Sequence, residues 1–131
     1  MHDTINGAMF KEMLLFGTVS IAQAQQAIND LNVFPVPDGD TGTNMSLTIQ
    51  TAAQELKKIE PATVDQAASV TASALLRGAR GNSGVILSLL FRGMSKSLKG
   101  CVTADGCTFA AAMQAGFSQW AQGVGTVAVL I

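Results

Sequence analysis

Apolar residues recur at intervals of three and four positions along most of this 131-residue chain, and this spacing limits the possible folds more than any other feature. Such intervals place apolar side chains on one face of an α-helix, and that face must then be buried. The spacing predicts helices over residues 4–31, 45–59, 63–78, from residue 84 to near residue 100, and over 108–121. Gly17 is a point at which the first helix could divide into two.

Short stretches rich in proline or glycine separate these predicted helices. Pro61 follows the second helix, and Thr63, with Gln66 three positions later, is the predicted N-cap of the third. The stretch "GARGNSG" separates the third helix from the fourth. Short connections make neighbouring helices antiparallel, so the sequence predicts an all-α antiparallel bundle, with residues 1–131 as a single domain.

Composition argues against several classes of function. Hydrophobic residues make up 48% of the chain, but none of its apolar runs reaches the roughly 20 residues of a membrane span, so we expect no transmembrane segment. The first residues lack the basic and apolar regions of a signal peptide, which favours the cytoplasm. A net charge of −1 without a run of Lys or Arg argues against nucleic acid as a partner.

The few residues that often carry catalysis or metal binding are also uninformative here. Cys101 and Cys107 are spaced like no common metal or redox motif, and we interpret them as ordinary reduced thiols. His2 is the only histidine, and we interpret it as a terminal residue rather than a catalyst.

The stretch "NVFPVPDGDTGTNM", residues 32–45, is a stiff and acidic connection between helices. Pro35 and Pro37 fix the backbone at two nearly adjacent positions and restrict the residues before them. Asp38 and Asp40 flank one glycine, and their carboxylates repel each other unless a cation lies between them. Such hard oxygen ligands suit Mg²⁺, which completes its coordination shell with water and phosphate oxygens.

Two helix starts follow such loops, and a helix start favours an anion because its first backbone amides are unpaired and its dipole is positive. The residues in question are Thr41, Gly42, Thr43 and Asn44 after the acidic loop, and Asn82, Ser83 and Gly84 in the second loop. Arg77 and Arg80 lie on the approach to the second. Together the loops indicate a site for metal-chelated phosphate, although Asp, Gly, Asn and Thr are also ordinary turn and cap residues, so simple turns remain the alternative.

The stretches "LNVFPVPDGDTGTNM" and "ARGNSGVILS" together closely resemble the nucleotide-binding domain of the dihydroxyacetone kinase (DhaL-like) family, in the branch found at the N-terminus of one of the proteins of bacterial fatty acid kinase. The resemblance is specific over about residues 5–98 and weaker over 108–121. It implies a barrel of about eight antiparallel helices that binds ATP and Mg²⁺. By their place in the motif, Asp38 and Asp40 would be metal ligands, with Asn32 as the third and Asp30 as its rival. The two helix starts would surround the phosphates.

The resemblance also implies an activity. The γ-phosphoryl group of ATP would pass to an acceptor presented by a partner, namely a fatty acid on an acyl-binding carrier protein or, less closely matched, dihydroxyacetone held by a different protein or domain. A non-catalytic helical interaction module or inactive fragment is the alternative, in which the loops survive only as turns.

The end of the chain departs from the family, whose domain continues into further helices. Here "QGVGTVAVLI" closes the chain, and residues 127–131 are predicted to form a β-prone apolar tail. We therefore expect either a C-terminally incomplete domain or a short form that covers its exposed face as a homodimer. In both cases the phosphate end of the nucleotide site would be intact, whereas the adenine end is in question.

Overall fold

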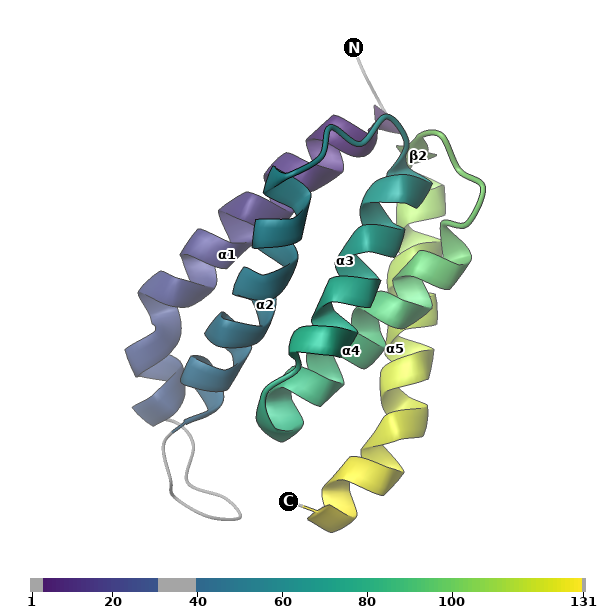
Figure 1. Ribbon diagram of the computed structural model, residues 1–131. Coiled ribbons are helices and arrows are strands. Elements are labelled where there is room, and N and C mark those ends of the chain that lie inside the picture. The colour runs from purple at the N-terminus through teal and green to yellow at the C-terminus, as the bar shows by residue number, and fades with distance from the viewer. Residues whose placement is uncertain (1–3, 31–39, 131) are drawn as a thin grey trace.

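A computed structural model describes residues 4–30 and 40–130, with the backbone alone for residue 120 and residues 122–130. The described helices are α1 (Gly7–Asp30), α2 (Thr41–Lys57), α3 (Val64–Gly78), α4 (Gly81–Ser97) and α5 (Gly106–Leu130). Two short strands, β1 (Thr4–Ile5) and β2 (Ala104–Asp105), pair antiparallel beside them. The predicted all-α bundle is confirmed (Figure 1).

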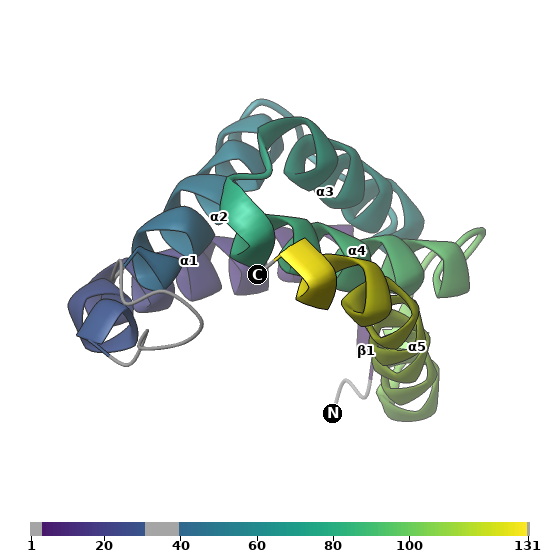
Figure 2. The same ribbon diagram turned by 90° about the horizontal axis from the view of Figure 1, so that it is seen from below.

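Helices that follow one another in the chain pack as antiparallel neighbours, as their short connections predict. Figure 1 shows that α2 and α4 begin at the same end of the molecule, where α1 and α3 finish. Seen along the helices in Figure 2, α1 and α5 lie at the two ends of an arch that α2, α3 and α4 complete. The topology therefore brings two helix N-termini together at one end.

The core consists of two clusters of buried apolar residues. The half-buried Phe91 of α4 packs against both clusters. One cluster contains Phe10, Val64, Ala67, Ala68, Met94, Leu98, Ala104 and Ala112. The other contains Leu14, Ile49, Ala52, Leu56, Ala74 and Leu75. Full burial of one Leu side chain contributes about 1.5–3 kcal/mol, so residues such as Leu56 and Leu75 hold the helices in this arrangement.

Three sequence-based predictions about the elements are wrong. Gly17 does not divide α1, which is one helix of 24 residues, because a cost of about 1 kcal/mol for an interior glycine is smaller than the gain from packing the helix. Residues 4–5 pair with β2, so α1 begins later than predicted. Residues 127–130 belong to α5 and form no extended tail, since β-propensity is a weaker constraint than continuation of a helix already begun.

Side-chain caps define where two helices begin. The Thr63 hydroxyl accepts a hydrogen bond from the Gln66 amide at 3.0 Å, which confirms the predicted N-cap of α3. Asp105 precedes α5, and its carboxylate accepts the Thr108 amide at 2.7 Å. This bond lowers the pKa of the Asp105 carboxyl. Its stabilising effect is therefore present above the ordinary carboxyl pKa and is lost as pH falls through the lowered value.

Helices α4 and α5 cross at two glycines that let their backbones touch. A Cβ added to Gly93 would lie against the carbonyl oxygen of Ala115 and 2.7 Å from the Cα of Gly116. A Cβ added to Gly116 would lie 2.6 Å from the carbonyl oxygen of Leu90. Either addition forces the two helices apart, because backbone atoms cannot move aside as a flexible side chain can.

We expect Gly93→Ala to destabilise the protein by about 1–3 kcal/mol, because the new methyl group meets backbone atoms of α5. Gly17→Ala is the matched control, since a Cβ there meets nothing within 4 Å, and it should stabilise α1 by about 0.5–1 kcal/mol. Thermal unfolding followed by circular dichroism measures both. A Gly93→Ala variant that is as stable as the parent, or more stable, would contradict the close crossing of α4 and α5.

Candidate functional site

The structure brings the two predicted phosphate-binding loops into contact. The side chain of Asn44, in the first turn of α2, lies over Gly81, the first residue of α4. A Cβ on Gly81 would meet the Asn44 side-chain amide and would lie 3.0 Å from its Cγ. The φ angle of Gly81 is +65°, which a residue with a side chain rarely adopts. Glycine is therefore required here both by backbone conformation and by the neighbouring amide.

A buried hydroxyl group joins the same two loops from inside. Thr48 is fully buried, and its hydroxyl donates to the Asn44 carbonyl oxygen at 2.7 Å. The Thr48 hydroxyl oxygen also accepts the backbone amide of Arg80 at 3.0 Å. A Cβ on Gly84 would meet this hydroxyl, so the glycine lets the first turn of α4 lie directly against α2. The relative position of the two helix starts is thus determined by hydrogen bonds and by a missing side chain.

The end of α1 holds the start of α2 from the other side. Asn29 accepts the Thr43 backbone amide at 3.0 Å and donates to the Thr43 hydroxyl at 3.0 Å. Gln25, one turn earlier, also donates to that hydroxyl, at 3.1 Å. A Cβ on Gly42 would meet the Gln25 carbonyl oxygen, so α1 and α2 are in close contact here.

Sequence reasoning did not identify Gln25 and Asn29 as part of this site. The available signal was two amide side chains four positions apart at the end of the first predicted helix, immediately before the acidic loop. They occupy one helical face, where two hydrogen-bonding groups would be costly to bury without partners. Their partner, Thr43, could not be predicted from the sequence, because it lies 14 to 18 positions further along the chain, beyond the acidic loop.

Both helix starts direct unpaired backbone amides toward the same end of the molecule. The first intrahelical bond of α2 joins the Asn44 amide to the Asp40 carbonyl oxygen at 2.8 Å, and that of α4 joins the Gly84 amide to the Arg80 carbonyl oxygen at 3.0 Å. The earlier amides of each first turn, at Asn82 and Ser83 for example, have no partner within the helix. Two converging positive helix ends make this place favourable for an anion. The Thr43 amide is already bonded to Asn29, so it orients the turn.

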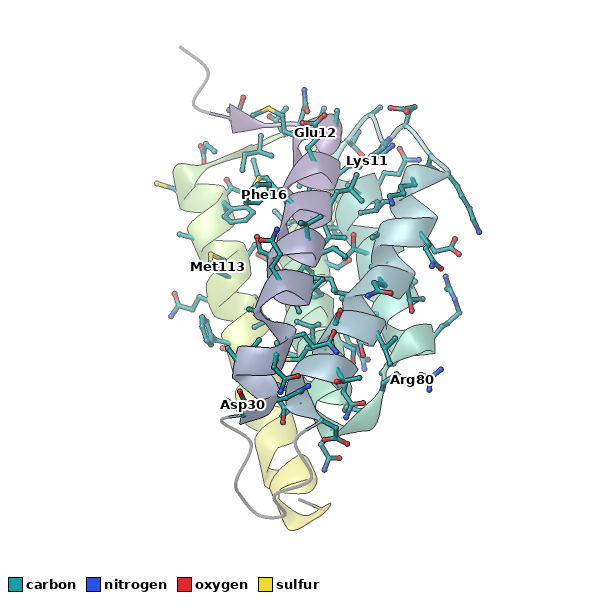
Figure 3. All side chains as sticks on the ribbon, turned by 90° about the vertical axis from the view of Figure 1, so that its left-hand side faces the viewer. Lys11, Glu12, Phe16, Asp30, Arg80 and Met113 are labelled. Carbon is teal, nitrogen blue, oxygen red and sulfur yellow. The ribbon has the colours of Figure 1, made fainter. Side chains whose placement is uncertain are left out.

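The predicted metal ligands are only partly described. Asn32 and Asp38 lie outside the described residues. Asp40 occupies the N-cap position of α2 with an exposed side chain that makes no capping hydrogen bond. Asp30, the rival third ligand, is the last residue of α1 (Figure 3) and accepts a hydrogen bond from Gln26 at 2.9 Å. Within residues 4–30 and 40–130, no three acidic, histidine or cysteine side chains gather as a metal site would require.

An apolar pocket of about 380 Å³ borders both helix starts. Met45 follows Asn44 on α2, and Ser83 belongs to the first turn of α4. The pocket is lined by Met45, Ser83, Ile86, Leu87, Leu90 and Phe117. A molecule with an anionic part and a flat apolar part would match this arrangement, because amides lie beside an apolar surface.

Among the described helices, none is long and apolar enough to cross a membrane.

Comparison with known proteins gives one family and several relatives that are similar in sequence. The DAK2 domain family matches residues 35–129. Protein YloV of Bacillus subtilis (strain 168) is 48% identical over 113 residues, which are 86% of this chain and 20% of YloV. An uncharacterized protein of Staphylococcus epidermidis is 42% identical over 116 residues, 88% of this chain and 21% of that protein. The chain thus spans about a fifth of the length of these relatives.

We expect Asn29→Ala to loosen the start of α2, because the Thr43 amide loses its side-chain acceptor. The loss should be about 1–2 kcal/mol of stability, and the Thr43 amide should exchange its hydrogen faster than in the parent. Gln26→Ala is the matched control, since it removes only an exposed hydrogen bond to Asp30. Hydrogen exchange followed by NMR distinguishes them. Unchanged protection of Thr43 in Asn29→Ala would contradict the role of Asn29.

Proposed function

This chain belongs to the DAK2 domain family of kinase-related nucleotide-binding modules, and on that basis we propose that it binds ATP with Mg²⁺ and positions the γ-phosphoryl group for transfer. The contact between Asn44 and Gly81 supports the proposal, because it brings residues of the two sequence motifs next to each other. Two helix starts converging there can hold phosphates through backbone amides. The adjoining apolar pocket is large enough to accept part of a nucleotide base.

The proposed roles follow the chemistry of each group. Backbone amides and side chains at the two helix starts would bind the phosphates: Thr41, Gly42, Thr43, Asn44, Asn82, Ser83 and Gly84. Asp38 and Asp40 would hold Mg²⁺, with Asn32, or its rival Asp30, as a further ligand. The ion would neutralise charge on the phosphate oxygens during transfer. Bonds to Asn29 and Gln25 hold Thr43 in place, so this residue would also orient the turn that contains the other amides.

The acceptor is proposed to come from a partner, because phosphoryl transfer depends on positioning and charge neutralisation more than on a base within this domain. The motifs match the fatty acid kinase branch more closely, so the proposed acceptor is a fatty acid on a carrier protein in the cytoplasm. A role in the phosphorylation of dihydroxyacetone is the next candidate. The activity of the whole protein is part of this proposal, since the chain spans about a fifth of its curated relatives.

A non-catalytic helical interaction module is a second candidate, favoured by apolar side chains that remain in water. Phe16 of α1 is 74% exposed and Phe117 of α5 is 54% exposed. Phe16 and Met113 are labelled in Figure 3, on the helices that end the arch. Monomeric proteins seldom expose such side chains together. In this alternative the surface serves assembly, including a homodimer, and the loops serve only as turns.

We expect a non-hydrolysable ATP analogue to bind the chain only when Mg²⁺ is present. Asp38→Ala or Asp40→Ala should weaken that binding about tenfold or more, because each removes a negative ligand of the ion. Glu12→Ala is the matched control, since it also removes an exposed acid, here at the other end of α1 (Figure 3). Isothermal titration calorimetry measures affinity, and circular dichroism should show unchanged helicity.

Two results would count against the proposal. Unchanged affinity in either aspartate variant would refute the metal assignment. An absence of binding by the folded parent chain would favour the interaction module.

A further inference from the structure

A polar groove of about 320 Å³ lies between α2 and the connection from α3 to α4. Its lining includes Gln50, Thr51, Gln54, Arg77, Gly78 and Arg80. Gly78 lets the end of α3 lie close to α2 at this groove, because a Cβ there would meet the Thr51 hydroxyl and push the two helices apart. None of the described residues that line the groove is acidic, so its charged side chains are both cationic.

Neither of these two arginines has a carboxylate partner, and the same holds for four of the other six cations that the structure describes. Lys11 pairs with Glu60 at 3.5 Å, and Lys58 pairs with Glu55 at 3.4 Å. Within the described part of the chain, neither Arg77 nor Arg80 forms an ion pair, although acidic residues slightly outnumber basic ones in the sequence. Two cations three positions apart repel each other, and no described acidic side chain in the groove offsets this repulsion.

Arg80 also occupies an electrostatically unfavourable place. It is the N-cap residue of α4, where Ser, Thr, Asp and Asn are preferred, and its side chain makes no capping hydrogen bond. The N-terminal end of a helix is positive, so a cation beside it is repelled. Arg77 lies in the last turn of α3, beside a negative helix end, so its position is favourable even without a ligand. Arg80 has no such compensation, and an anion in the groove would offset the cost there.

Neutral donors complete the lining. Gln50 and Gln54 lie one turn apart on α2, and Gln50 donates to the Ser46 hydroxyl at 3.0 Å through an amide nitrogen that carries a second hydrogen. Guanidinium and amide groups together match the oxygens of phosphate or carboxylate.

The groove lies on a different side of α2 from the apolar pocket of the candidate nucleotide site. Gln54 follows Met45, which lines that pocket, by two and a half helical turns, so the two side chains point about 180° apart around α2. In Figure 3, Arg80 lies on the flank opposite to Met113 of α5. A ligand in the groove therefore need not be the nucleotide.

We propose that this groove is a binding site for a small oxyanion, a phosphate or carboxylate group, separate from the proposed nucleotide site. Arg77 and Arg80 supply charge and paired donors, and the glutamines supply neutral donors. The inference goes beyond the proposed function and does not require that the chain bind ATP.

The test is a titration of the whole chain with inorganic phosphate, followed by NMR of the arginine Nε–H and glutamine side-chain amide signals. We expect the signals of Arg77, Arg80, Gln50 and Gln54 to shift together and to saturate. Arg77→Gln and Arg80→Gln should each weaken binding about tenfold or more through loss of charge-assisted hydrogen bonds. Arg92→Gln, which removes an exposed arginine elsewhere on α4, should bind phosphate like the parent.

Equal weakening in Arg92→Gln, or shifts confined to the first-turn amides of α4, would overturn the proposal. A second titration adds the ATP analogue and Mg²⁺ at saturation. Retained phosphate binding supports a separate site, whereas displacement by the nucleotide would assign the groove to the nucleotide site. The phosphate arm is measured without nucleotide, so a chain that fails to bind ATP still tests the groove.

Discussion

The hydroxyl of Thr48 is the interaction on which the arrangement of the functional end depends. It is buried, it bonds to the Asn44 carbonyl oxygen and the Arg80 amide, and it lies against Gly84. A buried hydroxyl without partners would be costly, so these bonds specify one register between α2 and the start of α4. A valine of similar shape could fill the volume but could not join the two backbones. The contact between Asn44 and Gly81 follows from that register.

The same end of the molecule concentrates positive potential in two places. At the starts of α2 and α4, backbone amides face the same end of the molecule, beside an apolar pocket. On the outer side of α2, Arg77 and Arg80 line a groove without a described acidic neighbour. The connection from α3 to α4 is common to both places, because the glycines beside it pack against α2 and its arginines line the groove. One short loop thus supports two anion-binding proposals.

Much of the fold could be predicted from the sequence, but the supports of the site could not. Helical spacing, Pro61 and the Thr63 cap act over a few residues, so they indicated the helices and most of their limits. The uninterrupted α1 and the helical end of α5 were missed, because packing and helix continuation outweigh the weak preferences of glycine and β-branched residues. Asn29 could not be assigned, since its partner Thr43 lies beyond a loop.

The sequence by itself determined an all-α chain and two loops suited to phosphate, because helix periodicity and cap chemistry are local properties. Only the tertiary structure decided that these loops meet, because α3 must return the chain along α2 before Gly81 can reach Asn44. The crossing of α4 and α5 at Gly93 was decided in the same way. Glycine is needed at Gly81 and Gly93 because neighbouring atoms occupy the space that a side chain would fill. Those atoms belong to distant parts of the chain, so the sequence alone does not reveal them.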